Sequence, residues 1–545
     1  MKLEEHKLYR WIILLLVLIG SLALWTDVME PDAALYASIA KNIVLKNDWL
    51  NLYVRGADWL DKPHLTFWIV AASFKLFGIS AFAYKLPSLL AGLLGAYYLY
   101  RLAKNLYNRQ TALLSVVIFL SALHLVISNF DVRAESYITS FVLASLYHYY
   151  RARRSSWLHL VAGSLFAACA IMVKGIFVVI PIFGGFIVYW LMTKQYQQFL
   201  KIKWWLALLL IFFFISPELF ALYQQFDLHP EKVVFGRTGY SGLRFFFWDS
   251  QFGRFFNNGP IKGRGDLAFF LHTTLWAFLP WSILLCGAVV SLFKKKGRAG
   301  LPPENIMVWS SAAITFLIFS LSKFQLPHYI LIIFPQFAMM TAVYLNKLAG
   351  KGLLTFYRIQ GVLLVLIMAL LMGLAVLFRF EATLWLILIL ALICLGNFLL
   401  FGKASKLTIV ASSSATAIGL MIFLYLFFYP AILKYQAGMQ AGRWLNEHYP
   451  QADVGVLMYV DAFSFDFYTR KEAKYFYSFE ELDKRNKKEM VLYVPLAQLP
   501  RLQTDYGAKV LKAFDYYHIT KLKGSFLNYR TRATVLEKFY LVKLP

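Results

Sequence analysis

Carboxylates, cations, histidines and tyrosines gather in a few short segments of this 545-residue chain, and their types indicate chemistry on a phosphate-bearing substrate. The carboxylates that could act as a general base or position a substrate are Asp32, Asp131 and Glu135. The residues that could hold a phosphate or a polar substrate are Tyr36, Lys62, His64, Lys174, Arg254, Lys323, His328 and Tyr329. An acidic centre ringed by cations suits a phosphate anion, because charged donors bind it most strongly.

Each of these residues also has a structural explanation when it is taken alone. Asp32 could cap the helix that follows it, Lys62 could lie in a turn, and Lys174 could extend towards the membrane surface. Asp131 could form a surface ion pair with Arg133. The functional interpretation therefore applies to the set, and it requires elements that bring the whole set to one place.

The composition excludes a chain of ordinary water-soluble domains. Hydrophobic residues make up 60% of the chain and charged residues only 15%, against about 25% charged in soluble proteins. The formal net charge of +26 does not indicate nucleic acid binding, because most basic residues lie in short runs between apolar stretches. All three cysteines, Cys169, Cys286 and Cys394, fall inside apolar runs, which excludes a disulfide framework and a cysteine-based metal site.

The elements that position the polar residues are membrane-spanning helices, since a bilayer core requires about 20 mostly apolar residues per helix. Thirteen spans are predicted, at residues 11–29, 83–103, 111–128, 136–150, 157–173, 175–193, 204–223, 267–292, 305–322, 328–346, 356–378, 382–401 and 407–430. The first is interpreted as a retained signal anchor, because no small-residue cleavage site follows it.

Lysine and arginine concentrate in every second loop, which orients the chain. With the N-terminus in the cytoplasm and the C-terminus outside, the basic residues of the cytoplasmic loops are Arg101, Lys104, Arg109, Arg151, Arg153, Arg154, Lys194, Lys201, Lys203, Lys294, Lys295, Lys296, Arg298, Lys347, Lys351, Lys403 and Lys406. Every segment that carries a candidate site residue then lies towards the outer face.

Three long segments lie outside in this topology: the loops 29–84 and 224–266, and everything after Pro430. The first loop carries two helical patterns, at residues 33–45 and 65–82, which predict helices lying at the membrane interface. In the C-terminal part, apolar runs at 454–460 and 490–494 predict strands, and the pattern at 480–488 predicts a helix. We therefore predict a transmembrane catalytic domain at 1–430 and a small extracytoplasmic α/β domain at 431–545.

Several of these segments resemble motifs of the polytopic GT-C glycosyltransferases, the group of the lipid A aminoarabinose transferase and the protein O-mannosyltransferases. Residues 30–37, EPDAALYA, resemble the first-loop pattern EPDEARYA, and residues 61–68, DKPHLTFW, resemble HKPPLxFW. Lys174-Gly175 resembles the pattern KG, and Arg254-Phe255 resembles RF. Residues 278–281 resemble xLPW, and residues 319–331 resemble FSxxxxKLPxYxLP. Order and position relative to the spans match from about residue 10 to 345.

Two departures from the family patterns concern the first loop. Asp32 is followed by Ala33 where the family usually has a second acid, and Asp61 stands where the family has histidine before the lysine, with His64 after the proline. The acid of the family's second outer loop corresponds to Asp131 or Glu135, and the sequence leaves both open. It also leaves a divalent metal ion open, because Asp32, His64, Asp131 and Glu135 are all potential ligands without a recognisable local spacing.

The resemblance implies transfer of a sugar, with inversion, from a polyprenyl phosphate such as undecaprenyl phosphate to a lipid A, glycan or protein acceptor. The reaction would take place at the periplasmic face of a bacterial inner membrane. Because a phosphate is already a good leaving group, the protein must supply cations rather than a strong acid. Lys62 and Arg254 are the leading candidates, with Lys174 and Lys323 as further cations.

The resemblance assigns the remaining residues to the sugar and the acceptor. Asp32 would act as general base or position the acceptor, with Asp131 or Glu135 assisting. Tyr36, His64, His328 and Tyr329 would line the sugar pocket or bind the phosphate, although aromatic residues also gather at bilayer surfaces as anchors.

A transporter and a membrane-anchored binding module are the alternative functions, and each would require different features of the sequence. A transporter or flippase of lipid-linked sugars would also need many spans, but it usually has two similar halves and broken helices at mid-membrane, and the sequence shows no such repeat. An external binding module on a membrane anchor would need only one helix. The aromatic run Phe245–Trp248 could gate entry of the lipid or form the face of an interfacial helix. The expected partners are the donor lipid, its acceptor and membrane lipids, with no nucleic acid.

Overall fold

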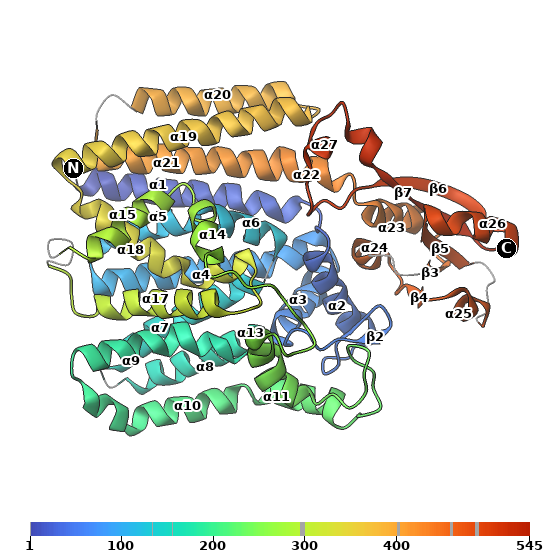
Figure 1. Ribbon diagram of the computed structural model, residues 1–545, viewed down its shortest axis with the longest axis horizontal. Coiled ribbons are helices and arrows are strands. Elements are labelled where there is room, and N and C mark those ends of the chain that lie inside the picture. The colour runs from blue at the N-terminus through green and yellow to red at the C-terminus, as the bar shows by residue number, and fades with distance from the viewer. Residues whose placement is uncertain are drawn as a thin grey trace.

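The computed structural model describes residues 2–132, 134–154, 156–294, 300–400, 404–457, 462–484 and 490–545. Arg133, Lys295, Lys296, Arg298 and Lys403, which entered the sequence interpretation, lie outside the described residues. Long helices run side by side in one bundle, and a mixed α/β unit stands at one end of it, opposite the end where the N-terminus lies (Figure 1). The short elements of the first and large outer loops lie at the same end as the α/β unit (Figure 1).

The first half of the chain builds one side of the bundle and the first outer segment. Its elements are α1 (Lys2–Ser21), η1 (Leu22–Trp25), α2 (Asp32–Lys46), β1 (Tyr53–Val54), β2 (Ala57–Asp58), α3 (Leu65–Phe77), α4 (Ala81–Leu106), α5 (Arg109–Leu120), α6 (Leu123–Asp131), α7 (Ala134–Ala152), α8 (Trp157–Lys174), η2 (Ile176–Val178), α9 (Val179–Met192), η3 (Tyr196–Leu200), α10 (Ile202–Phe214), α11 (Ser216–Leu222), η4 (Tyr223–Asp227), α12 (Gly242–Arg244), η5 (Phe245–Gly253) and α13 (Arg254–Phe256).

The second half completes the bundle and then forms the α/β unit. Its elements are α14 (Phe269–Ala277), α15 (Ser282–Leu292), α17 (Asn305–Leu321), η6 (Pro327–Ile333), α18 (Phe334–Lys347), α19 (Gly350–Phe378), α20 (Thr383–Leu400), α21 (Lys406–Ile422), η7 (Phe423–Phe428), α22 (Tyr429–Leu433), α23 (Ala437–His448), β3 (Asp453–Leu457), α24 (Phe463–Tyr468), β4 (Lys474–Phe476), α25 (Phe479–Asp483), β5 (Met490–Pro495), η8 (Leu496–Gln498), α26 (Leu499–Tyr506), β6 (Lys509–Tyr516), α27 (Gly524–Leu527), η9 (Arg532–Val535) and β7 (Glu537–Lys543).

Among the described residues, helical segments lie in each range predicted as a span, with breaks in several of them, and the chain has the character of a polytopic membrane protein. The number of thirteen spans stays a prediction. Within the described residues, five helices are long and apolar enough to cross a membrane, or seven if each of two bent pairs counts as one span. The bend of 57° between α5 and α6 is one of these breaks. There the Trp281 indole donates to the Ser121 hydroxyl at 2.8 Å, and the Leu123 amide donates to the Leu279 carbonyl at 2.9 Å. These bonds satisfy polar groups that the interrupted helix leaves exposed, as a membrane interior requires.

The two helices expected in the first outer loop are present as α2 and α3, with one difference in length. The expected range 65–82 ends at Phe77, because Gly78 adopts a φ of +77°, a conformation that favours glycine. The Ser80 hydroxyl then accepts the Ala83 amide at 3.2 Å and starts α4, so residues 81 and 82 belong to the next helix.

The α/β unit, residues 437–545, contains a five-stranded mixed sheet in the order β4-β3-β5-β7-β6. β3 pairs in parallel with β4 and β5, while β7 pairs antiparallel with β5 and β6. Alternate residues of β5 pack on opposite faces: Tyr493 joins the core under α23 and α24, and Leu492 joins the core under α25 and α26. Helices therefore cover both faces of the sheet. The boundary at 430/431 stays a prediction.

The packing of α9 on α17 generates a first test. A Cβ atom on Gly185 would lie 2.4 Å from the Met307 carbonyl oxygen, whereas one on the adjacent Gly184 would lie 3.6 Å from the nearest atom of Ile314. We expect Gly185→Ala to lower the free energy of unfolding by about 1–3 kcal/mol through overpacking. Gly184→Ala should not lower it, because alanine also favours helix. Thermal unfolding of both variants in detergent tests this, and equal midpoints would contradict the packing.

Candidate active site

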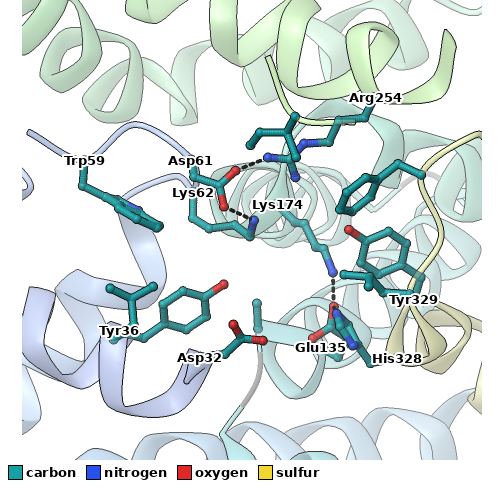
Figure 2. A pocket seen from close by; sticks show the side chains of 15 residues that line it. Asp32, Tyr36, Trp59, Asp61, Lys62, Glu135, Lys174, Arg254, His328 and Tyr329 are labelled. Carbon is teal, nitrogen blue, oxygen red and sulfur yellow. Dashed lines mark hydrogen bonds and ion pairs between the residues drawn. The ribbon is translucent and has the colours of Figure 1, made fainter. Parts of the chain in front are cut away.

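A cavity of about 220 Å³ opens at the end of the bundle that faces the α/β unit, and most of the candidate residues line it. Its lining residues are Asp32, Leu35, Tyr36, Trp59, Asp61, Lys62, Ala134, Glu135, Lys174, Arg254, Ile261, Phe324, Leu326, His328 and Tyr329. Figure 2 shows Asp32, Lys62 and Arg254 directed towards the same space. They come from α2, from the loop before α3 and from α13, so the fold joins segments that lie far apart in sequence.

The two leading phosphate candidates are held by one carboxylate. Lys62 Nζ donates to Asp61 Oδ2 at 2.5 Å, and Arg254 donates to the other oxygen, Oδ1 (Figure 2). Burial alone would raise the pKa of the Asp61 carboxyl, but Lys62 and Arg254 outweigh it and hold this pKa below its usual value. Burial lowers the pKa of the Lys62 ammonium, and Asp61 offsets that effect only in part. Asp61 therefore stays ionised and keeps two cations side by side.

Lys174 is the third cation of the cavity, and it is the last residue of α8. Its ammonium forms an ion pair with Glu135, in the first turn of α7, and lies 4.0 Å from the centre of the Tyr329 ring. The side chains of Lys174 and Glu135 are only 8% and 3% exposed. His328 Nε2 lies 3.7 Å from the same Glu135 oxygen. Lys174 thus points into the protein rather than along the membrane surface.

Asp32 is the first residue of α2, and its carboxylate faces the space between the two ion-paired groups (Figure 2). Tyr36, one helical turn later, lines the same wall. Glu30, two residues before Asp32, points the other way and accepts the backbone amide of Ser464 at 2.8 Å. The acidic motif of the first loop therefore contributes a single carboxylate to the cavity.

Three predicted site residues lie away from the cavity lining. His64 is fully buried, with Nδ1 2.9 Å from a Glu218 carboxylate oxygen and Nε2 3.0 Å from the Leu50 carbonyl oxygen, so both ring nitrogens are occupied. Asp131 is buried at the end of α6, where its charge acts on Lys85. Lys323 is exposed, and the backbone around it packs against Gly263 and Gly265. Of the two acids left open by the sequence, the structure places Glu135 at the cavity.

Two lining residues were missed from the sequence as functional residues. Asp61, which departs from the family pattern, received no role in the sequence analysis, although its position directly before Lys62 was a usable signal. Trp59 had no signal beyond its proximity to that motif. Its side chain lines the cavity, and its Nε1 atom is a buried donor for which the described part of the chain offers no partner.

An apolar groove of about 440 Å³ adjoins the cavity. The two share Lys174, Arg254, Phe324 and Tyr329, and the rest of the groove is mostly hydrophobic: Ile176, Phe177, Val179, Ile180, Phe252, Phe255, Phe256, Ile318 and Phe319. The groove thus ends at the cations, which suits an amphiphile with an anionic head and a long apolar tail.

Of the aromatic run at residues 245–248, Phe245 and Phe246 are buried, whereas Trp248 is 55% exposed.

Among the described residues, no three His, Cys, Asp or Glu side chains lie close enough together to hold a metal ion.

The architecture matches solved membrane enzymes. The crystal structure of ArnT from Cupriavidus metallidurans bound to undecaprenyl phosphate superimposes with a TM-score of 0.76 over 98% of this chain and 97% of that protein, at 16% sequence identity. The oligosaccharyltransferase of Archaeoglobus fulgidus matches with a TM-score of 0.51 over 90% of this chain and 70% of its own, at 10% identity. At such identities the likeness shows the fold alone.

Sequence comparison decides the family. The family described as dolichyl-phosphate-mannose-protein mannosyltransferase matches residues 61–220. An uncharacterized protein of Aquifex aeolicus is 30% identical over 389 residues, which are 68% of this chain and 71% of that protein. The chain belongs to the GT-C glycosyltransferases of the aminoarabinose transferase and protein mannosyltransferase type.

Named relatives of this glycosyltransferase match less completely. The undecaprenyl phosphate-alpha-4-amino-4-deoxy-L-arabinose arabinosyl transferase of Erwinia tasmaniensis is 27% identical over 61% of this chain and 57% of its own length. A second transferase of that name from Proteus mirabilis is 26% identical over 63% of this chain and 59% of its own length. The chain thus spans less than two thirds of the length of these two relatives.

The buried His64–Glu218 pair gives a prediction that separates structure from substrate binding. We expect His64→Ala to lower the free energy of unfolding by about 3–5 kcal/mol, because it leaves a buried carboxylate without its main partner. The His229–Glu231 pair has the same 2.9 Å separation but is 49% and 69% exposed, so His229→Ala is the matched control and should change nothing measurable. Thermal unfolding in detergent measures both, and an equal effect of the two variants would contradict a structural role for His64.

Proposed function

We propose that this protein transfers a sugar, with inversion, from a polyprenyl phosphate donor to a lipid acceptor at the outer face of a bacterial inner membrane. The observation that carries the proposal is the junction of the polar cavity with the apolar groove at Lys174 and Arg254. A donor lipid can lay its prenyl tail in the groove while its phosphate reaches Lys62, Arg254 and Lys174. Relatives named for undecaprenyl phosphate and aminoarabinose support this donor class.

The geometry supports a direct displacement at the anomeric carbon. The acceptor oxygen attacks that carbon from the side of Asp32, while the bond from the carbon to the phosphate oxygen breaks on the side of Lys62 and Arg254. The electron pair of the broken bond stays on the phosphate, where the cations stabilise the growing charge. If the acceptor is a hydroxyl, its proton passes to Asp32. If it is an ionised phosphate, Asp32 only positions it, and Trp59 can donate to a sugar oxygen.

We call Lys62, Arg254 and Lys174 together the phosphate clamp. Asp61 holds Lys62 and Arg254 in place before the donor binds. Two cations brought together in a buried site repel each other, and the Asp61 carboxylate pairs with both and offsets part of their charge before the donor arrives. The donor phosphate competes with Asp61 for the same N–H groups. After transfer, Asp61 can pair with them again, which helps the polyprenyl phosphate product to leave.

The proposal includes thirteen membrane spans with the N-terminus in the cytoplasm and the C-terminus in the periplasm. The alternation of basic loops along the sequence supports this topology, as does the grouping of the cavity, the outer loops and the α/β unit at one end of the bundle (Figure 1). Glycan and protein acceptors are alternatives to a lipid such as lipid A.

Asp32→Asn tests the catalytic assignment. With a lipid acceptor that offers a hydroxyl, we expect transfer from a polyprenyl-phosphate-linked sugar to fall by about 10²–10⁴-fold, the usual contribution of a general base. Asp48→Asn is the matched control, because Asp48 accepts the amides of Leu50 and Asn51 at 3.1 Å and asparagine can do the same. Transfer by Asp32→Asn at the wild-type rate would remove the assignment. Movement of the donor across vesicle membranes without transfer would indicate a flippase instead.

Lys62→Met and Arg254→Met test the phosphate clamp. Each variant removes one charged donor, so we expect the affinity for polyprenyl phosphate to fall by about 10- to 10²-fold, corresponding to about 1.5–3 kcal/mol. Lys323→Met is the control, since Lys323 has the same charge but lies outside the cavity lining, and it should change the affinity less than about twofold. Calorimetric titration of the purified protein in nanodiscs measures these values. Equal losses in all three variants would contradict the assignment.

A further inference from the structure

Helix α2 carries contacts on two opposite faces, and only one of them belongs to the cavity. Asp32, Leu35 and Tyr36 line the cavity. Ser38 and Lys41 contact α24, a short helix of the α/β unit. At 3.6 residues per turn, Asp32 and Lys41, nine residues apart, lie on opposite sides of the helix, and Ser38 lies at the edge between the two sides, three residues after Leu35 and three before Lys41. The side of α2 opposite Asp32 therefore packs against the α/β unit.

Lys41 makes the main contact on the back of α2. Its side chain is buried, and Nζ donates to the carbonyl oxygens of Asp466 at 2.6 Å and Thr469 at 2.5 Å, at the C-terminal end of α24. The last carbonyls of a helix lack intrahelical partners and carry partial negative charge, so an ammonium is well placed there. Burial lowers the pKa of the Lys41 ammonium, and the nearby Asp466 carboxyl opposes this effect.

A second set of contacts holds the start of α2. Glu30 accepts the Ser464 amide at 2.8 Å and also the Ser464 hydroxyl, in the first turn of α24. The Glu30 amide donates to Gln436 Oε1 at 2.6 Å, and Gln436 Nε2 donates to the Val28 carbonyl oxygen at 3.1 Å. Glu30 and Lys41 thus form hydrogen bonds at the two ends of α24. Asp32 lies between them in sequence and faces the cavity.

Helix α24 is itself fixed to the sheet of the α/β unit. A Cβ atom on Gly438 of α23 would lie 2.6 Å from the Ser464 hydroxyl oxygen and 2.8 Å from the Phe465 nitrogen, so the two helices touch backbone to backbone. The Phe465 ring stacks on Tyr493 of β5, with 4.6 Å between ring centres. A displacement of α24 would therefore require a displacement of the sheet.

We propose that the α/β unit is a positioning element of the catalytic site, which acts through Glu30 and Lys41 to hold α2 and set the place of Asp32. The proposal rests on the function proposed above for Asp32. Glu30 and Lys41 are positioning residues, because neither lines the cavity. None of the cations that would bind the phosphate lies on α2 or α24, since Lys62, Lys174 and Arg254 come from the loop before α3, from α8 and from α13.

Lys41→Met tests the proposal in the full-length protein. It removes the charged donor but keeps a long apolar side chain, so α2 loses its main contact with α24. We expect kcat for transfer to fall by about 10- to 10²-fold, the effect of a small misplacement of a catalytic group. The affinity for polyprenyl phosphate should stay within about twofold of wild type, which a general loss of folding would not allow, because the clamp residues are untouched. Lys41→Arg, which keeps the donors, should restore most of the activity.

Lys46→Met is the matched control on the same helix. Lys46 also contacts the α/β unit, through Glu472 at 3.0 Å, but both side chains are more than a third exposed. We expect its kcat to equal that of the wild type, since exposed ion pairs contribute little. Ser464→Ala removes one hydroxyl from Glu30 and should give a smaller loss of kcat than Lys41→Met, again with unchanged polyprenyl phosphate binding.

Two outcomes would overturn the proposal: transfer by Lys41→Met at the wild-type rate, or loss of polyprenyl phosphate binding together with transfer. Failure of the wild-type protein to transfer any sugar would instead count against the proposed function. Hydrogen exchange of the α2 amides then still tests the contact, because it requires no activity. Faster exchange in Lys41→Met than in Lys46→Met supports the positioning role, and equal exchange overturns it.

Discussion

The pairing of Asp61 with both Lys62 and Arg254 is the interaction on which the cavity depends. A membrane protein can keep several charges at the end of a helical bundle only if each is compensated, since an isolated buried charge is very costly. Here three cations and three carboxylates line one cavity, and Asp61 and Glu135 form ion pairs with these cations. This compensation lets the site hold enough positive charge for a phosphate while it remains stable before the substrate binds.

The neighbouring groove explains why the cations lie where they do. Lys174 and Arg254 belong to both the polar cavity and the apolar groove, so the boundary between the two environments passes through them. An amphiphilic donor meets the same boundary at its phosphate. In the proposed function, recognition of the lipid depends on matching two surfaces of different polarity, and the reacting bond lies at their junction.

The outer segments and the α/β unit form one support for the carboxylate side of the cavity. α2 presents Asp32 on one face and is held through Glu30 and Lys41 on the other. On the phosphate side, Lys62 comes from the loop before α3, Arg254 from α13 and Lys174 from the end of the bundle helix α8. The groups for the two halves of the proposed reaction, loss of the phosphate and attack by the acceptor, therefore come from different segments of the chain.

The sequence by itself determined the class of the protein and identified most of the charged and polar residues that line the cavity. Apolar stretches predicted the helices, since a bilayer demands length and hydrophobicity that are read locally. The motifs around Asp32, Lys62, Lys174, Arg254 and Tyr329 predicted lining residues, because each motif places polar side chains in or beside a segment predicted to lie at the outer face. Only the tertiary structure decided between Asp131 and Glu135, moved His64 and Lys323 out of the cavity lining, and added Asp61 and Trp59. The physical reason is that a side chain's partner comes from another helix: Glu218 occupies His64, Lys174 meets Glu135, and no local spacing records such a contact.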